Sequence, residues 1–161
     1  MNRVCLSLGS NIGDRKHSIS IASGNINNTI GKIISSSSFY ETEPWGFNDE
    51  NFFLNQCIII ETTLTPENVL QELLAIEEKM GRTRVGKLYA SRIIDLDILF
   101  YDDMILETPQ LVIPHPLLHK RRFVLMPLAE IAPEMIHPVF KKTIHQLLEE
   151  CDDKMKVELY K

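Results

Sequence analysis

Two aspartates separated by one residue are the sharpest chemical signal in this sequence. On a β-strand, Asp95 and Asp97 would point to the same face, with their backbones about 6.6 Å apart. Two carboxylates so placed repel each other unless a divalent cation or a strongly basic neighbour relieves the repulsion. Carboxylate oxygens suit Mg²⁺, and this spacing could hold two ions roughly 4 Å apart, as phosphoryl-transfer sites do. Read alone, the pair also fits an ordinary solvated strand surface.

Basic side chains stand on both sides of the aspartate pair. Guanidinium groups bind phosphate oxygens bidentately, so a metal pair between two basic clusters would form a cradle for a polyphosphate. A solvated surface is the alternative reading of such segments. The sequence contains no Walker A motif, so side chains and metal ions would have to hold any nucleotide. The two clusters comprise Arg82, Arg84, Lys87 and Arg92 before the pair, and His115, Lys120, Arg121 and Arg122 after it.

A possible platform for a flat heterocycle lies in another apolar segment. Phe53 and Asn55 are alternate residues and would share one strand face. An aromatic ring can stack on a heterocycle, while an amide can both donate and accept hydrogen bonds along its edge. Phe53 also fits a core position, whereas an asparagine within a strand packs poorly unless it is hydrogen-bonded. Asn55 is therefore the stronger candidate of the two.

The elements that must position these groups follow from hydrophobic periodicity. Strands are predicted where apolar residues alternate or cluster, and helices where they recur every three or four residues after a capping residue. The order strand, helix, strand, strand, helix, strand predicts an α+β fold, a ferredoxin-like sandwich with helices on one face of an antiparallel sheet. The other face would be free to build a site. The predicted strands cover residues 3–8, 33–40, 52–63 and 93–101, and the helices run from the Asp14 cap to Gly31 and from Thr65 to Gly81.

The last third of the chain is harder to assign. Residues 123–132 are apolar, but Pro127 and Pro133 argue against one long helix there. Residues 142–155 are predicted to form a final helix that buries Ile144 and Leu147.

Composition limits the classes of function. With 161 residues, we expect residues 1–161 to form a single domain. The net charge of −5 argues against a protein that coats nucleic acid. No apolar run approaches the roughly 18 residues of a membrane span, so a cytoplasmic location is expected. Three widely spaced cysteines fit neither a disulfide framework nor a Cys-x-x-Cys site, and we expect them to be reduced.

Taken together, these motifs resemble the 6-hydroxymethyl-7,8-dihydropterin pyrophosphokinase family of folate biosynthesis. The resemblance extends over nearly the whole chain, with order and spacing conserved along it, and only about the last 20 residues lie outside it. It rests on LGSN at 8–11, FYETEP at 39–44, FLN at 53–55, EEKMGR at 77–82, SRIIDLDI at 91–98, PHP at 114–116, RRFVL at 121–125 and PLAEIAP at 127–133.

The resemblance implies a reaction in which a pterin alcohol attacks the β-phosphorus of ATP and AMP leaves. Two Mg²⁺ ions would be held by Asp95 and Asp97, and Arg82 and Arg92 would lie on a mobile loop that closes over the reaction. Closure would exclude water as a competing acceptor. The residues implied to contact ATP are Glu77, Arg84, Tyr89, Ile98, His115 and Arg121.

The resemblance also implies a pterin site. Asn55 would supply hydrogen bonds, main-chain groups around Thr42 and Trp45 would add others, and the ring would stack between Phe53 and Phe123. The implied pterin-binding residues are Thr42, Glu43, Pro44, Trp45, Phe53, Asn55 and Phe123.

This sequence departs from the family pattern at three places. Tyr89 stands where a tryptophan is expected, Gln110 replaces a residue that is often basic, and Phe53 replaces a tyrosine. None of these positions is a metal ligand, so we expect altered affinity or loop kinetics with activity retained.

Two rival functions remain to be separated from this one. Another Mg²⁺-dependent nucleotidyl or phosphoryl transferase would share the aspartates and arginines but not the pocket of Asn55, Phe53 and Phe123. A non-catalytic RNA-binding sandwich is opposed by the acidic net charge and by the absence of an aromatic-rich RNA-binding motif. The expected partners are small molecules, ATP and the pterin alcohol, with no nucleic acid or membrane, and the expected state is a monomer.

Overall fold

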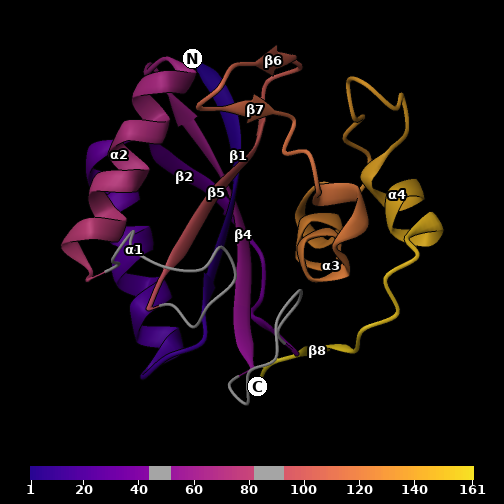
Figure 1. Ribbon diagram of the computed structural model, residues 1–161, viewed down its shortest axis with the longest axis horizontal. Helices are drawn as coiled ribbons and strands as arrows, with labels where there is room; N and C mark the ends of the chain where they lie inside the picture. Colours follow the sequence, from indigo (N-terminus) through magenta and orange to yellow (C-terminus); the bar gives the residue numbers. More distant parts are fainter. Residues whose placement is uncertain (44–51, 82–92) are drawn as a thin grey trace.

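A computed structural model describes residues 1–43, 52–81 and 93–161, and it is built around a six-stranded antiparallel sheet (Figure 1). The strand order is β5-β1-β4-β3-β8, and β2 pairs with β4 beside β3. The α+β class predicted from the sequence is confirmed, and the predicted order of strands and helices holds with one difference, because three strands instead of two lie between the first two helices in the described part of the chain. The strands are β1 (Asn2–Ser10), β2 (Lys32–Ser36), β3 (Tyr40–Thr42), β4 (Phe53–Thr62), β5 (Asp95–Tyr101) and β8 (Val157–Leu159).

Alternation along the strands sends neighbouring side chains into two separate cores. Leu6 and Ile58 lie in one core, whereas Cys5 and Cys57, their neighbours in sequence, lie in the other. This is the two-residue period of a pleated strand with both faces covered. The sheet therefore has no fully solvated face in its centre.

Helices α1 (Arg15–Thr29) and α2 (Pro66–Lys79) cover the first face. Both begin as the sequence predicts, because Asp14 accepts a hydrogen bond from the His17 N–H, and Thr65 accepts one from the Asn68 N–H. The apolar stripe of each helix is buried at Ile19, Ala22 and Ile26 in α1 and at Val69, Leu73 and Ile76 in α2.

Helices α3 (Arg122–Ile131) and α4 (Ile144–Glu150) lie on the opposite side of the sheet (Figure 1). The sequence predicts that this face is free, but α3 packs on the core that contains Cys57 and Leu99. The structure also differs at Pro127, which lies inside α3 and is buried there. The missing N–H of a helical proline costs about 3 kcal/mol, and the apolar packing of Val124, Leu125 and Leu128 compensates for it.

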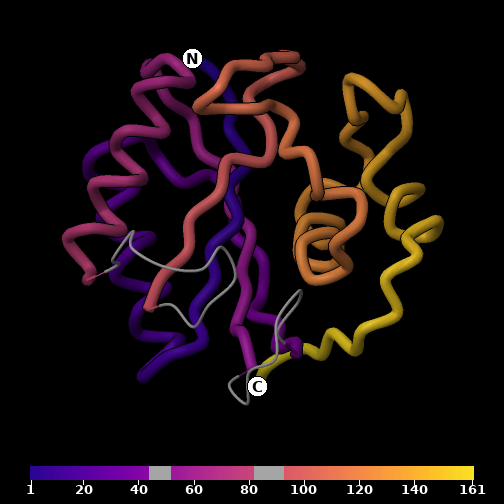
Figure 2. The backbone as a smooth tube through the Cα atoms, viewed as in Figure 1, coloured from indigo at the N-terminus to yellow at the C-terminus, as the bar shows by residue number. Residues whose placement is uncertain are grey.

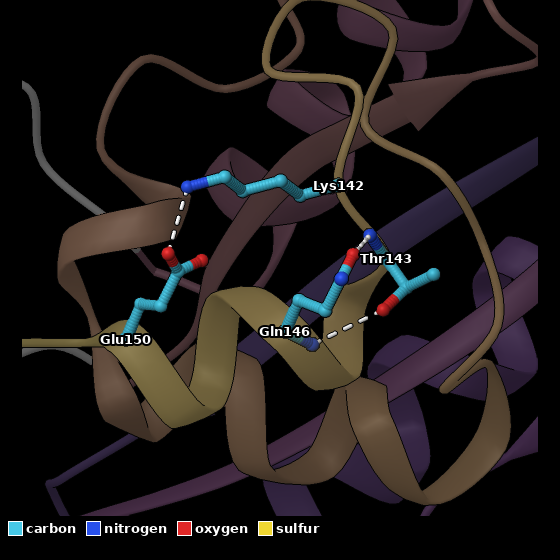
Figure 3. Close-up of polar contacts among 4 residues, drawn as sticks. All are labelled: Lys142, Thr143, Gln146 and Glu150. Atoms are coloured by element: carbon cyan, nitrogen blue, oxygen red, sulfur yellow. Dashed lines mark hydrogen bonds and ion pairs between the residues drawn. The ribbon is translucent and has the colours of Figure 1, made fainter.

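Helix α4 is shorter than the predicted 142–155 helix but has a defined start. Thr143 and Gln146 form a capping box, in which each side chain accepts a hydrogen bond from the other residue's backbone N–H (Figure 3). Lys142 and Glu150 form an exposed ion pair of 2.8 Å alongside (Figure 3). After Glu150 the chain runs back beneath α3 to the sheet, where it forms β8 (Figure 2).

Other elements differ from the sequence prediction in their limits. The predicted strand 33–40 is divided into β2 and β3, because Ser37 turns inward and its hydroxyl accepts a hydrogen bond from the Cys57 N–H. The short hairpin of β6 (Leu106–Glu107) and β7 (Val112–Ile113), the 3-10 helix η1 (Leu118–Lys120) and β8 were not predicted. Each has two or three residues, which is too short for a periodic pattern.

The three cysteines are buried and free, as expected. Burial raises the pKa of the Cys5 thiol to about 12. No helix in the three described ranges has the length and apolar character needed to cross a membrane.

His137 is a buried histidine that packs against Phe100, a residue of the core beneath α3. Its side chain is 3% exposed, stacks on Phe140 at 4.4 Å and meets Phe100 edge-on at 5.5 Å. Its Nδ1 accepts hydrogen bonds from the N–H groups of Val139 and Phe140. Burial, with a smaller contribution from His119, lowers the pKa of His137 to about 4, so the ring is neutral in the folded protein at neutral pH.

We predict that His137 makes the protein sensitive to mild acid. Between about pH 6.5 and pH 4 the unfolded chain binds a proton at this residue and the folded chain does not, so stability falls as the pH is lowered through this window. The slope of the unfolding free energy against pH measures how many more protons the unfolded chain binds than the folded chain. His137→Gln should lower that number by up to about one. Urea titrations between pH 4 and pH 7 would measure it, with His145→Gln, at an exposed position of α4, as the control. An unchanged slope for His137→Gln would contradict the prediction.

Candidate active site

The central strand β1 aligns the candidate residues because it pairs with β4 on one side and β5 on the other. Gly9 lies opposite Asn55 of β4 and opposite Asp95 of β5. Residues directly opposite each other in an antiparallel pair point to the same face. Asp95, Gly9 and Asn55 therefore form one row across three strands, with the backbones of Asp95 and Asn55 roughly 10 Å apart, two strand spacings.

The row faces the side of the sheet that carries α3. Cys57 lies two positions after Asn55 on β4, and Leu99 lies two positions after Asp97 on β5. Both Cys57 and Leu99 belong to the core on which α3 packs. Since side chains alternate, Asp95, Asp97 and Asn55 point to this same side. Phe123, in the first turn of α3, packs against the same core. The structure thus brings the aspartate pair, the amide and Phe123 to one face of the sheet.

Gly9 leaves the floor of this row without a side chain. A Cβ atom at Gly9 would lie 3.2 Å from Asn55 Oδ1 and 3.7 Å from Phe53 Cδ1. The Asn55 side chain is 3% exposed, and its Nδ2 has no hydrogen-bond partner among residues 1–43, 52–81 and 93–161. A buried amide donor without a partner is unfavourable, so the geometry suits a ligand that can accept a hydrogen bond from it.

Helix α3 is tied to the strand beside Asn55 by a carboxylate. Tyr40 of β3 lies opposite Asn55, and its hydroxyl donates to Glu130 of α3 at 2.6 Å. Ser38 donates to the other oxygen of Glu130 through its N–H and its hydroxyl. Burial, and then Glu130, raise the pKa of Tyr40 to about 12, so its hydroxyl remains a donor. These bonds hold the helix that carries Phe123 against the strands that carry Asn55.

His115 lies close to the aspartate row. Its N–H donates to the carbonyl of Leu99 in β5, and its Nδ1 accepts from the Leu117 N–H at 3.1 Å. Burial and the charge of Arg121 lower the pKa of His115 to about 4, while Asp95 acts in the opposite direction. The neutral ring therefore carries its proton on Nε2, where it can donate to a ligand oxygen.

The other phosphate and pterin candidates lie around this face. The Arg121 guanidinium lies over the Phe123 ring at 5.7 Å, a cation–π geometry that links the two. Thr42 is buried in β3, and its hydroxyl donates to the Lys156 carbonyl. Glu43 is exposed at the end of a described range, and Gln110 is exposed between β6 and β7.

Two candidates for contact with the nucleoside are buried on the first face. Ile98 is 4% exposed within the core beneath α1 and α2, so only its backbone is available at the site. Glu77 of α2 is 2% exposed and accepts a hydrogen bond from the Leu96 N–H at 2.8 Å.

Several sequence candidates lie outside the described residues. They share the segments 44–51 and 82–92, and they are Pro44, Trp45, Arg82, Arg84, Tyr89 and Arg92.

The sequence analysis missed Gly9, Tyr40 and Glu130. A glycine within an alternating strand is a signal of close approach by a neighbouring group, and this signal was available at Gly9. Tyr40 and Glu130 are 90 positions apart, and no local pattern relates them.

Three comparisons relate this chain to known proteins. The family model for 7,8-dihydro-6-hydroxymethylpterin-pyrophosphokinase matches residues 5–133. The chain is 39% identical over 153 residues to a 2-amino-4-hydroxy-6-hydroxymethyldihydropteridine pyrophosphokinase of Methylorubrum extorquens, covering 94% of this chain and 95% of that protein. The protein of the same name from Porphyromonas gingivalis is 42% identical, covering 84% of this chain and 93% of the relative.

A solved structure shares the fold. The Plasmodium falciparum HPPK-DHPS protein with pteroate superposes with a TM-score of 0.76 at 21% identity, covering 92% of this chain. This chain spans 42% of that longer chain.

We predict that adding one methyl group at Gly9 displaces the Asn55 amide. Gly9→Ala should shift the Asn55 side-chain NH₂ signals in ¹⁵N–¹H spectra and lower the melting temperature, because the new Cβ would lie 3.2 Å from Oδ1. Gly24→Ala is the control, since Gly24 lies in α1 with no neighbour within 4 Å of an added Cβ. That change should stabilise the helix by up to about 1 kcal/mol. Unmoved Asn55 signals in Gly9→Ala would refute the prediction.

Proposed function

This chain belongs to the 7,8-dihydro-6-hydroxymethylpterin-pyrophosphokinase family, and we propose that it performs the family's reaction on the sheet face that carries Asp95, Asp97 and Asn55. It is an ATP-dependent pyrophosphoryl transferase of folate biosynthesis. The reaction transfers pyrophosphate from ATP to 6-hydroxymethyl-7,8-dihydropterin and releases AMP.

The observation that carries the proposal is the row formed by Asp95, Gly9 and Asn55. It places candidate ligands for a metal–phosphate complex about two strand spacings, roughly 10 Å, from an amide that can read a heterocycle. Between them, Gly9 carries no side chain, so Asn55 Oδ1 and Phe53 can approach the backbone of the central strand closely. The rival transferases considered from the sequence need the carboxylates but not this amide.

The carboxylates fit Mg²⁺ that is brought in with a nucleotide. Asp95 and Asp97 are partly exposed, and no group of three or more His, Cys, Asp or Glu side chains in the described ranges could form a metal cage. Mg²⁺ is commonly held by one or two carboxylates, with water and phosphate oxygens as its other ligands. Asp95 and Asp97 would hold two such ions, whose charge would offset the charge on the triphosphate.

The phosphate end of the site is assigned to basic and neutral donors. His115, neutral and with its proton on Nε2, can donate to a phosphate oxygen without repelling the nearby cations. Arg121 adds a guanidinium. Arg82, Arg84 and Arg92 are proposed from the sequence to complete the contacts.

The pterin end of the site is assigned to Asn55, Phe53 and Phe123. The Asn55 amide lacks a partner for Nδ2 within the part of the chain that the structure describes, and the edge of a pterin ring offers acceptors for it. Phe53 lies next to Gly9, and Phe123 comes from α3, so a flat ring can stack between elements on the same face. Stacking on an aromatic ring contributes about 1–3 kcal/mol per base in nucleic-acid complexes.

Product analysis tests the reaction directly. Incubation of the protein with ATP, Mg²⁺ and 6-hydroxymethyl-7,8-dihydropterin should yield AMP and the pterin diphosphate in equal amounts, because the β-phosphorus is the centre of attack. Chromatography with phosphorus detection would identify both products. ADP or inorganic pyrophosphate as the main product would contradict the proposal.

Removal of one carboxylate tests the metal role. Asp97→Ala should lower Mg²⁺-dependent turnover by more than about 100-fold, since loss of an outer-shell partner alone costs 10–100-fold. Folding should be retained, because the side chain is partly exposed. Asp103→Ala, an exposed aspartate in the turn after β5, is the matched control and should remain active. Near-normal turnover in Asp97→Ala would remove Asp97 from the metal site.

A further inference from the structure

Glu77 is a buried carboxylate that the proposed reaction does not require at the reacting atoms. It lies in the last turns of α2, is 2% exposed, and belongs to the side of the sheet opposite Asp95 and Asp97. Burial of a charged side chain is unfavourable unless hydrogen bonds or opposite charges compensate for it. A role for Glu77 must therefore be sought in the bonds it makes within the protein.

One bond of Glu77 is to the backbone between the two aspartates. Its Oε2 accepts a hydrogen bond of 2.8 Å from the N–H of Leu96. Leu96 follows Asp95 and precedes Asp97, so this peptide group sets the direction in which both aspartate side chains leave the strand.

The position of β5 in the sheet explains why such a bond is needed. Within the described residues, β5 pairs with β1 and is the last strand of the sheet order, so no strand is paired with its outer edge. Backbone N–H groups on an edge strand depend on water or side chains for their partners. Glu77 supplies that partner at Leu96 and so fixes the edge where the aspartates must hold their spacing.

We propose that Glu77 is a positioning residue that orients the Asp95 and Asp97 carboxylates through the Leu96 N–H. This inference rests on the proposed function, because it takes the two aspartates to be the Mg²⁺ ligands. It changes the role suggested by the family resemblance, in which Glu77 contacts the nucleoside. Groups that hold metal ligands in place commonly affect metal affinity or activity by 10–100-fold when they are lost.

Two conservative substitutions at Glu77 separate the effect of side-chain length from the effect of charge. Glu77→Gln keeps the length of the side chain and an acceptor oxygen but removes the charge. Glu77→Asp keeps the charge but shortens the side chain by one methylene, which withdraws the acceptor from the Leu96 N–H. If the bond to Leu96 is the function, the glutamine variant should behave as the wild type and the aspartate variant should be impaired. Glu72→Ala removes another carboxylate from α2, five positions before Glu77, and is the control for general effects on the helix.

The measurement is pyrophosphoryl transfer as a function of Mg²⁺ concentration at saturating ATP and pterin, with the KM for ATP determined separately. Glu77→Asp should raise the Mg²⁺ concentration for half-maximal rate by roughly 10-fold to 100-fold with little change in the KM for ATP. Glu77→Gln and Glu72→Ala should stay within about threefold of the wild type. Hydrogen exchange at the Leu96 amide should be fast in Glu77→Asp and slow in the wild type and Glu77→Gln.

Opposite results would overturn the proposal. A normal Mg²⁺ midpoint in Glu77→Asp, or an impaired one in Glu77→Gln, would show that the bond to Leu96 is not what matters. A raised KM for ATP with an unchanged Mg²⁺ midpoint would instead assign Glu77 to the nucleotide. A failure of the proposed Mg²⁺ role of the aspartates would be recognised separately. In that case Asp97→Ala would keep near-normal turnover, whatever the results for the Glu77 variants. If Glu77→Asp does not fold, Glu77→Ala is measured in its place, because it also removes the acceptor from the Leu96 N–H. It should show the same raised Mg²⁺ midpoint and fast Leu96 exchange, and a normal midpoint would overturn the proposal.

Discussion

The site depends on the double pairing of β1. One strand sets the register of both β4 and β5, so Asn55 and Asp95 meet across Gly9 although they are 40 positions apart in the sequence. A slip of one residue in either pairing would turn one of these side chains to the opposite face. Buried apolar residues on both faces of β1 oppose such a slip, because it would exchange Leu6 and Leu8 with Cys5 and Ser7. Core packing and active-site geometry are therefore specified by the same register.

The face of the sheet that carries α3 is used partly for core packing and partly for the proposed site. Helix α3 covers the half that holds Cys5, Cys57 and Leu99, while the half with Asn55 and the aspartates continues along the same strands. Phe123 stands at the start of α3, between the covered half and the site. The bonds from Tyr40 and Ser38 to Glu130 secure the other end of α3, so the position of Phe123 depends on the helix as a rigid body.

The sequence predicted the local elements of this structure better than the tertiary contacts between them. Asp95, Asp97, Phe53 and Asn55 were found because a strand of period two relates residues that are close in sequence. The α1 and α2 starts were found because Asp14 and Thr65 cap them locally. Pairings such as Tyr40 with Glu130 and Glu77 with Leu96 join elements through tertiary packing, which no local pattern records. Pro127 inside α3 is the converse case, since packing there outweighs a strong local preference.

Asn55 illustrates why a binding residue and a stabilising residue need not coincide. Its Nδ2 is buried without a partner among the described residues, and such a group costs about 1–3 kcal/mol. A ligand edge that accepts this hydrogen bond restores the lost interaction, so part of the binding free energy comes from relieving a cost already present in the free protein. The neighbouring Gly9 keeps the amide in place by leaving Oδ1 uncrowded. A heterocycle lacking the acceptor would leave the donor buried and unpaired, which makes the pair a determinant of specificity.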